Sequence, residues 1–341
     1  MPIYKTGLFA IRYQQNQLII LDQTELPNKI SYLKLQNYRE VILAIKQLRI
    51  RGAPLIGVAA AYSLALESTR KSSNLRNHLK KAAHELKLAR PTAVNLSWAI
   101  DRMLAIINNN KIVDNKLSTS LIAEAVKIEK QEQANSNKIG QIGAALIKDN
   151  MTIMTICNTG WLAAPGIGTA LGIIYTAHKQ GKRIKVFVLE TRPLLQGARL
   201  TAFELEQAKI PYTIITDNMM GTFMRNTDIV LTGADRIVQN GDTANKIGTL
   251  TLAITSHYYK VPFYVVAPTS SVDLNKKTGK DIIIEERDKN EILYVGKQLI
   301  APKHANACNP AFDITPNNLI TGIITEKGIL KSSFYKSLSR L

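Results

Sequence analysis

The chain has 341 residues and a formal net charge of +18, from 44 Lys and Arg against 26 Asp and Glu. Its length exceeds the ~100–200 residues of a typical domain, so we expect one large or two moderate domains. Hydrophobic residues make up 45% of the chain. No apolar run reaches the ~18 residues that a membrane-spanning helix needs, which argues against a membrane protein. The two cysteines exclude a disulfide framework and favour a reducing, cytoplasmic compartment.

The positive charge is compatible with nucleic acid, an anionic membrane or anionic small molecules. The basic residues, however, are scattered in short groups such as 179–185 and 275–280, and aromatic residues make up only 6% of the chain. Scattered lysines without interleaved aromatics favour a solvated basic surface. We therefore expect no specific nucleic-acid binding and no membrane binding.

Residues 1–125 predict a mainly helical N-terminal domain with a few strands. The first 24 residues alternate as strands do and do not resemble a signal peptide. Helical apolar spacing follows at 41–50, 57–69, 75–89 and 93–107. The polar stretch 108–120 is expected to be a connection, and 121–147 a long helix.

Residues 126–341 predict a second domain, in which strands alternate with helices from residue 151 onward. The predicted strands are 151–157, 184–190, 212–217, 228–235 and 262–268. The predicted helices are 168–182, 199–209, 219–226 and 246–259. This alternation predicts parallel βαβ units and an α/β fold with a doubly wound, mainly parallel, Rossmann-like sheet.

Each predicted strand ends on a reactive or turn-forming residue: Cys157, Glu190, Asp217, Asp235 and Pro268. Ligands of open α/β sheets bind beyond the carboxyl ends of the strands, which would bring Cys157 and Asp235 to one rim. A lone cysteine is also commonly a small buried hydrophobe. From the strand alone, both interpretations of Cys157 stay open.

A glycine-rich turn follows Cys157, with glycines at Gly166, Gly168 and Gly172. The third glycine comes one residue too late for the dinucleotide-binding pattern G-x-G-x-x-G. Glycines that allow a tight turn and close helix packing are an equally good interpretation. The turn therefore does not predict a nucleotide cofactor.

Three predicted helix starts carry residues suited to a phosphate. Arg51 precedes a Gly-Ala-Pro turn, Arg90 precedes Pro91 as a helix opener, and Asn245 with Lys246 opens the helix after Asp235. Backbone N–H groups at a helix start and an adjacent cation both favour an anion. Each start alone is more often an ordinary helix N-terminus.

Taken in order, these segments resemble one known family. The quoted stretches are "RGAPLIGVAAAY", "RPTAVNLSWAIDRM", "CNTG", "ETRPLLQGARLTAFEL", "GADRIVQNGDTANKIGT" and "NPAFDITPNNLITGIITEKGIL". They resemble the S-methyl-5-thioribose-1-phosphate isomerases, which form one family with the alpha, beta and delta regulatory subunits of translation initiation factor 2B. The resemblance covers nearly the whole chain.

The resemblance implies a catalytic pair, Cys157 and Asp235. It also implies a homodimer and a set of substrate-binding residues: Arg51, Gly52, Ala53, Arg90, Gln196, Asn245 and Lys246. Three departures concern Ile156, where the family usually has histidine, Pro165 in the glycine-rich turn, and the stretch 216–224, which is bulkier than the common form. All three leave the catalytic pair intact.

The implied reaction converts S-methyl-5-thio-α-D-ribose 1-phosphate to S-methyl-5-thio-D-ribulose 1-phosphate in methionine salvage. The phosphate locks the anomeric carbon, so the enzyme must open the ring, and Asp235 is a candidate general acid if burial raises its pKa. Hydrogen then moves from C2 to C1 as a proton or a hydride, with Cys157 as base or as transition-state stabiliser.

We expect no cofactor, because the isomerisation is internally balanced, and no metal, because the five histidines show no ligand spacing. Two alternatives remain. One is a related isomerase that acts on 5-deoxyribose or ribose phosphates. The other is a regulatory protein like the initiation-factor subunits, against which the retention of Cys157 and Asp235 argues.

Overall fold

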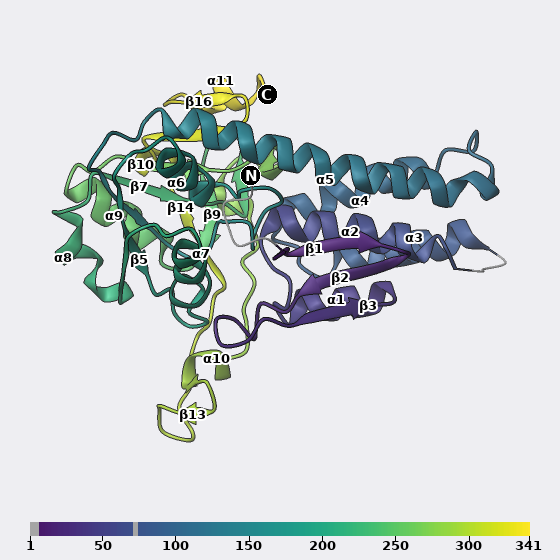
Figure 1. The fold of residues 1–341 in the computed structure, drawn as a ribbon, viewed down its shortest axis with the longest axis horizontal. Helices are drawn as coiled ribbons and strands as arrows, with labels where there is room; N and C mark the ends of the chain where they lie inside the picture. The colour runs from purple at the N-terminus through teal and green to yellow at the C-terminus, as the bar shows by residue number, and fades with distance from the viewer. Residues whose placement is uncertain (1–6, 71–73) are drawn as a thin grey trace.

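The computed structural model describes residues 7–70 and 74–341, so the first six residues of the predicted N-terminal strands lie outside it. Figure 1 shows a group of helices flanked by a small sheet on one side and a larger α/β part on the other. Within the described ranges, no helix is long and apolar enough to cross a membrane.

The N-terminal part contains a small antiparallel sheet and four helices. The strands, in the order β1-β2-β3, are β1 (Ile11–Gln14), β2 (Gln17–Leu21) and β3 (Tyr32–Leu35). The helices are α1 (Tyr38–Lys46), α2 (Ala53–Glu67), α3 (Leu75–Lys87) and α4 (Val94–Ile107). Every residue of α2 is buried, since this helix is apolar on all sides and the other elements surround it.

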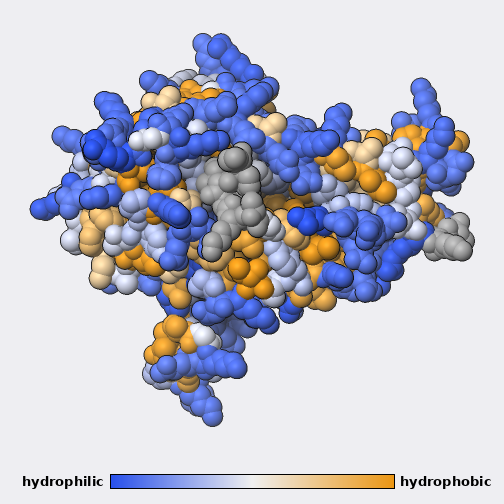
Figure 2. Space-filling model, in the orientation of Figure 1, coloured by the Kyte–Doolittle hydropathy of each residue, from blue (hydrophilic) through white to orange (hydrophobic). Residues whose placement is uncertain are grey.

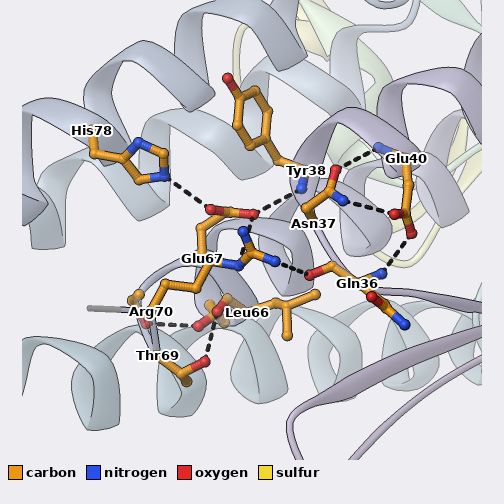
Figure 3. Close-up of polar contacts among 11 residues, drawn as sticks. Gln36, Asn37, Tyr38, Glu40, Leu66, Glu67, Thr69, Arg70 and His78 are labelled. Carbon is orange, nitrogen blue, oxygen red and sulfur yellow. Dashed lines mark hydrogen bonds and ion pairs between the residues drawn. The ribbon is translucent and has the colours of Figure 1, made fainter. Parts of the chain in front are cut away.

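A buried carboxylate joins three of these helices at the end of α2, as Figure 3 shows. Glu67 accepts a hydrogen bond from the backbone N–H of Tyr38, at 3.0 Å, where α1 begins. It also contacts Nε2 of His78 on α3 at 2.8 Å, and Arg70 at 3.7 Å. The guanidinium of Arg70 donates to the carbonyl of Gln36. This cluster fixes α1 and α3 against the end of α2.

The long helix α5 (Asp114–Ala144) links the two parts of the molecule (Figure 1). The sequence assigned 108–120 to a connection, which is wrong for 114–120, because these residues form the first turns of α5. Leu117 and Leu121 lie four residues apart on one buried face, with the exposed Thr119 between them on the opposite side. The proposed boundary at 125 falls inside this helix.

The larger part is built on a seven-stranded sheet in the order β16-β15-β10-β7-β4-β5-β6. Its strands are β4 (Thr152–Thr155), β5 (Lys185–Leu189), β6 (Tyr212–Ile215), β7 (Ile229–Thr232), β10 (Phe263–Val266), β15 (Gly322–Thr325) and β16 (Gly328–Leu330). Every neighbouring pair is parallel except β15 with β16. The five predicted strands are confirmed, each somewhat shorter, whereas β15 and β16 were not predicted.

Helices α6 (Ala170–Lys179), α7 (Ala202–Gln207), α8 (Met220–Met224) and α9 (Thr249–Tyr258) follow these strands. The predicted helix 199–209 begins differently, with a π-helical turn at Gly197–Thr201 before α7. The predicted helix at 246 is also wrong at its start. Gly248 has a φ of +99°, which a helix cannot continue, so α9 begins only at Thr249.

Asn245 and Lys246 therefore lie on a strand rather than at a helix start. They belong to β9 (Thr243–Lys246), in a second sheet of order β11-β8-β9-β14. The other strands of this sheet are β8 (Arg236–Val238), β11 (Val272–Asp273) and β14 (Phe312–Thr315). Pairing with β8 and β14 on both sides of β9 overrides the helical pattern of the local sequence.

An arm protrudes from the larger part and carries α10 (Asn290–Leu293), β12 (Tyr294–Val295) and β13 (Gln298–Leu299). Exposed hydrophobic residues gather on it, as Figure 2 shows, and they include Val295 and Ile300. The chain then returns to the sheet through β14 and ends in α11 (Phe334–Leu338).

Candidate functional site

A pocket lies beyond the carboxyl ends of β4 and β7, which are neighbours in the sheet. We call it the central pocket. It is lined by Leu48, Arg51, Gly52, Arg90, Cys157, Gln196, Asp235, Lys246, Arg287, Ala311 and Phe312. Seven of the nine predicted site residues are among them. The other two, Ala53 and Asn245, line an adjoining pocket that shares Arg51, Gly52, Cys157 and Asp235. The structure thus brings all nine together.

The start of α2 closes one side of the central pocket. Gly52 has a φ of +89°, and a Cβ at this position would lie 2.2 Å from the carbonyl oxygen of Ala163. Only glycine allows this approach of the helix start to the loop that follows β4. The backbone N–H of Leu55 donates to the same oxygen at 3.2 Å. Gly52, at the start of α2, lines the central pocket, so the positive end of the helix dipole lies at the pocket and favours an anion there.

Arg51 extends from this helix start to the residues after β4. Its Nη1 donates to Oδ1 of Asn158 at 2.6 Å, and its Nη2 donates to the Asn158 carbonyl at 2.9 Å. Nη2 also lies 3.8 Å from Sγ of Cys157. The buried guanidinium of Arg51, which comes from the helical part, is thus held beside the thiol of Cys157.

Cys157 lies beyond β4 in a strained backbone conformation, with a φ of +62°. Two buried threonines hold it there: Oγ1 of Thr191 accepts its N–H at 2.8 Å, and Oγ1 of Thr201 donates to its carbonyl at 2.6 Å. The thiol lines both pockets. The structure therefore favours a cysteine presented to a pocket over one enclosed at the end of a strand.

Asp235 lies three residues beyond β7, with its side chain only partly open to the pocket. Burial raises the pKa of this carboxyl, while the positive charges of Arg90, Arg51 and Lys246 oppose the increase. A carboxyl group with a raised pKa retains its proton more readily and can serve as a general acid.

Three further cations line the central pocket. Lys246 is buried on β9, and desolvation lowers its pKa. Arg90 lies 3.9 Å from the carboxylate of Glu285 and over the ring of Phe312. The sequence placed Arg90 at a helix start opened by Pro91, which is wrong, because α4 begins only at Val94 after a turn.

The third cation, Arg287, was missed by the sequence analysis. It comes from the segment that leads into the arm, and hydrogen bonds of 3.0 Å to Glu285 and 2.6 Å to Glu291 hold it. No sequence motif marks Arg287 as a site residue, because an arginine between acidic residues is typical of an exposed surface. Together with Arg51, Arg90 and Lys246, it makes the pocket suitable for an anionic ligand.

Gln196 and Asn245 offer amide groups to the two pockets. Gln196 is buried, and its Oε1 finds no hydrogen-bond partner within the described part of the chain. Such an unpaired buried acceptor suits a hydroxyl of a ligand. Nδ2 of Asn245 donates to Thr232 and Thr249, at 2.7 and 3.0 Å, which commits the nitrogen to the fold.

Across residues 7–70 and 74–341, no group of three or more His, Cys, Asp or Glu side chains is arranged to hold a metal ion.

Comparison with known proteins identifies the family of this chain. The model of the initiation factor 2 subunit family matches residues 49–332. This chain belongs to that family. The matched range contains all nine predicted site residues and both sheets of the larger part.

The most similar relatives include a methylthioribose-1-phosphate isomerase of Dehalococcoides mccartyi, 50% identical over 94% of this chain and 98% of its own length. Among solved structures, the 5-methylthioribose 1-phosphate isomerase of Pyrococcus horikoshii is 36% identical with a TM-score of 0.90, over 100% of this chain and 99% of its own. The delta subunit of translation initiation factor eIF-2B from A. fulgidus is 39% identical with a TM-score of 0.84, over 98% of this chain and 100% of its own.

Proposed function

We propose that this protein converts S-methyl-5-thio-α-D-ribose 1-phosphate into S-methyl-5-thio-D-ribulose 1-phosphate, an aldose–ketose isomerisation of methionine salvage. The observation that carries the proposal is the central pocket, in which Cys157 and Asp235 lie among four cations. Relatives named for this activity are up to 50% identical over nearly the whole chain, which supports the same assignment.

In the proposed mechanism, Asp235 acts as the general acid that opens the ring. It donates its proton to the ring oxygen as the bond from that oxygen to C1 breaks, a step favoured by its raised pKa. Hydrogen then moves from C2 to C1 and the C2 hydroxyl releases its proton, which restores the proton that Asp235 gave up, so C2 is oxidised to the ketone and C1 is reduced by the same amount. Cys157 acts beside these carbons, as the base of a proton route or as a stabiliser of a hydride route.

The substrate phosphate is proposed to lie against Arg51, Arg90, Lys246 and the start of α2, formed by Gly52 and Ala53. Cations and helix N–H groups are the partners that phosphate prefers. Gln196 and Asn245 are proposed to bind the sugar. In this arrangement the phosphate end is held by charge, and the reacting carbons face Cys157 and Asp235.

Two alternatives are decided by the same experiment. The first alternative is a regulatory protein without turnover, for which the 39% identity to an initiation-factor subunit speaks. An isomerase of 5-deoxyribose 1-phosphate would use the same residues. We expect turnover of methylthioribose 1-phosphate when both sugars are assayed side by side, with the Cys157→Ser variant as a blank. No turnover of either sugar would leave the regulatory function, and turnover of the deoxy sugar alone would change the substrate.

We also propose a Rossmann-like architecture for residues 126–341, with 1–125 as a mainly helical N-terminal domain, and a cytoplasmic homodimer as the active form. Dimers are the commonest closed assembly of soluble chains, and a 37.8 kDa chain is easily distinguished from its dimer. Sedimentation should give twice the chain mass. A mass that stays at one chain across a wide concentration range would exclude the dimer.

A further inference from the structure

A buried carboxylate lies directly behind the central pocket. Glu204, on α7, is 1% exposed and accepts four hydrogen bonds. Its Oε1 accepts from Nδ2 of Asn158 at 2.8 Å and from the backbone N–H of Leu162 at 3.3 Å. Its Oε2 accepts from the hydroxyl of Tyr175 at 2.8 Å and from the backbone N–H of Trp161 at 2.9 Å. All four donors are neutral groups.

Asn158 connects this carboxylate to Arg51. A carboxylate only accepts hydrogen bonds, so the nitrogen of the Asn158 amide must face Glu204. The amide oxygen is thereby turned toward Arg51, whose Nη1 donates to it at 2.6 Å. Nδ2 of Asn158 also donates to Oγ1 of Thr201 at 3.3 Å, and Arg51 has a second bond to the Asn158 carbonyl, so Glu204 controls the amide half of the contact between Asn158 and the guanidinium.

Space around the carboxylate is as restricted as its hydrogen bonding. A Cβ on Gly160 would lie 1.9 Å from Oε2 of Glu204, so the loop after β4 closes on the carboxylate with no room for a side chain. Burial raises the pKa of Glu204 to about 7, since desolvation outweighs the four hydrogen bonds. An uncharged side chain would be less costly to bury, so stability alone does not account for a glutamate here.

We propose that Glu204 is a positioning residue that holds Arg51 in the substrate pocket through the amide of Asn158. The inference deepens the proposed function and depends on it for the role of Arg51 in phosphate binding. Glu204 does not touch the pocket itself. Its contribution reaches the substrate through Asn158 and Arg51, while its bonds from the backbone N–H groups of Trp161 and Leu162 hold the loop after β4.

The test is a double-mutant cycle with Glu204→Gln and Arg51→Ala. Glutamine keeps the shape of the side chain but has one acceptor oxygen in place of two, so its nitrogen must face a backbone N–H on either side, and the bond to the Asn158 amide is weakened. In the wild-type background we expect KM to rise about 10-fold with little change in kcat, the size of one weakened charge-assisted contact. In the Arg51→Ala background, Glu204→Gln should no longer raise KM, because the group that it positions is absent.

A matched control separates positioning from loss of a buried charge. Glu132, on α5, is the other buried glutamate with a pKa of about 7, and it accepts from Ser270 and Asn135. Glu132→Gln should leave KM unchanged. An equal rise in KM for both glutamine variants, or an equal factor for Glu204→Gln with and without Arg51, would overturn the proposal.

Two further measurements test the positioning role even if the Glu204→Gln variant does not fold or the protein turns over no sugar. If Glu204→Gln does not fold, Asn158→Ala takes its place in the cycle, with the same loss of effect expected in the Arg51→Ala background. The cycle is also measured by calorimetric titration with inorganic phosphate, which needs no turnover. If the wild-type protein binds phosphate but turns over no sugar, the proposed isomerase function is refuted, and the phosphate titrations still measure the coupling between Glu204 and Arg51. Wild-type protein that does not bind phosphate would overturn the positioning role.

Discussion

At the residue scale, the pocket depends on two backbone conformations that most side chains avoid. Gly52 and Cys157 have φ angles of +89° and +62°. Glycine adopts this region freely, whereas a cysteine needs its surroundings to hold it there. Thr191 and Thr201 provide that restraint at both peptide groups of Cys157. The backbone of Cys157 is therefore fixed before any ligand binds.

We expect Cys157→Ser and Asp235→Asn to fold normally and each to lose ~10²–10⁴-fold in kcat, the usual contribution of a general acid or base. Serine keeps the size of cysteine without its acidity, and asparagine cannot donate the same proton. Steady-state kinetics with methylthioribose 1-phosphate measures the loss. A variant with nearly wild-type turnover would remove its residue from the mechanism.

We expect Gly52→Ala to abolish activity and to lower the free energy of unfolding by more than the ~1–3 kcal/mol of backbone strain alone. The new Cβ would meet the carbonyl of Ala163 at 2.2 Å and separate α2 from the loop. Gly181→Ala is the matched control, with a φ of +85° and no atom within 4 Å of the added Cβ. Equal losses in chemical denaturation would show that strain, not the contact, matters at Gly52.

At the element scale, a buried polar cluster joins helix α4 to the loop after β10. Nδ2 of Asn95 donates to Ser270 at 2.7 Å, and Oδ1 of Asn95 accepts from Ser271 at 3.0 Å. The same loop carries Pro268 into the adjoining pocket. Two elements that are 175 residues apart in the chain are thus held in register at the site.

We expect Asn95→Ala to lower the free energy of unfolding by about 1–3 kcal/mol, because both serine hydroxyls lose a buried partner. Denaturant titration measures the change. Asn108→Ala, at the exposed end of the same helix, should change stability by less than about 0.5 kcal/mol. A similar effect of the two substitutions would mean that the cluster contributes nothing beyond helix propensity.

At the scale of the whole molecule, buried carboxylates determine how stability depends on pH. Burial raises the pKa of both Glu132 and Glu204 from 4.5 to about 7. The folded protein then binds protons more tightly than the unfolded chain between these values. Stability is therefore highest below the unfolded pKa and falls as pH rises toward 7.

For this reason we expect Glu132→Gln to flatten the pH profile of stability. The fall in the free energy of unfolding between pH 5 and pH 8 should shrink by about 2–3 kcal/mol relative to the wild type, the value of one such titration. Denaturant titrations at the two pH values measure it. An unchanged fall would mean that Glu132 titrates near its ordinary pKa in the folded protein.

Much of the fold could be predicted from the sequence, because local patterns of apolar and turn-forming residues determine where strands and helices form. Apolar runs with turns at both ends located β4, β5, β6, β7 and β10, and the same pattern located the rim residues Cys157 and Asp235. Where tertiary pairing competed with the local pattern, the sequence prediction was wrong, as at Lys246 on β9. Ile156, one of the departures from the family, is buried in the same hydrophobic cluster as Cys157.

The partners that organise the site were decided only by the tertiary structure. Arg51 and Asn158 are 107 residues apart, and Cys157 meets Thr201 across 44 residues. Glu204 lies in a helical pattern where a glutamate is typical of an exposed face, but the loop at Gly160 closes on it and Tyr175 bonds to it, so it is buried. A hydrogen bond needs two groups within about 3 Å, and their separation along the chain carries no sign of that approach. The sequence by itself therefore determined which residues stand at the strand ends, and tertiary packing decided what holds them there: Thr191, Thr201 and Glu204 within the α/β part, and Arg51 from the helical part.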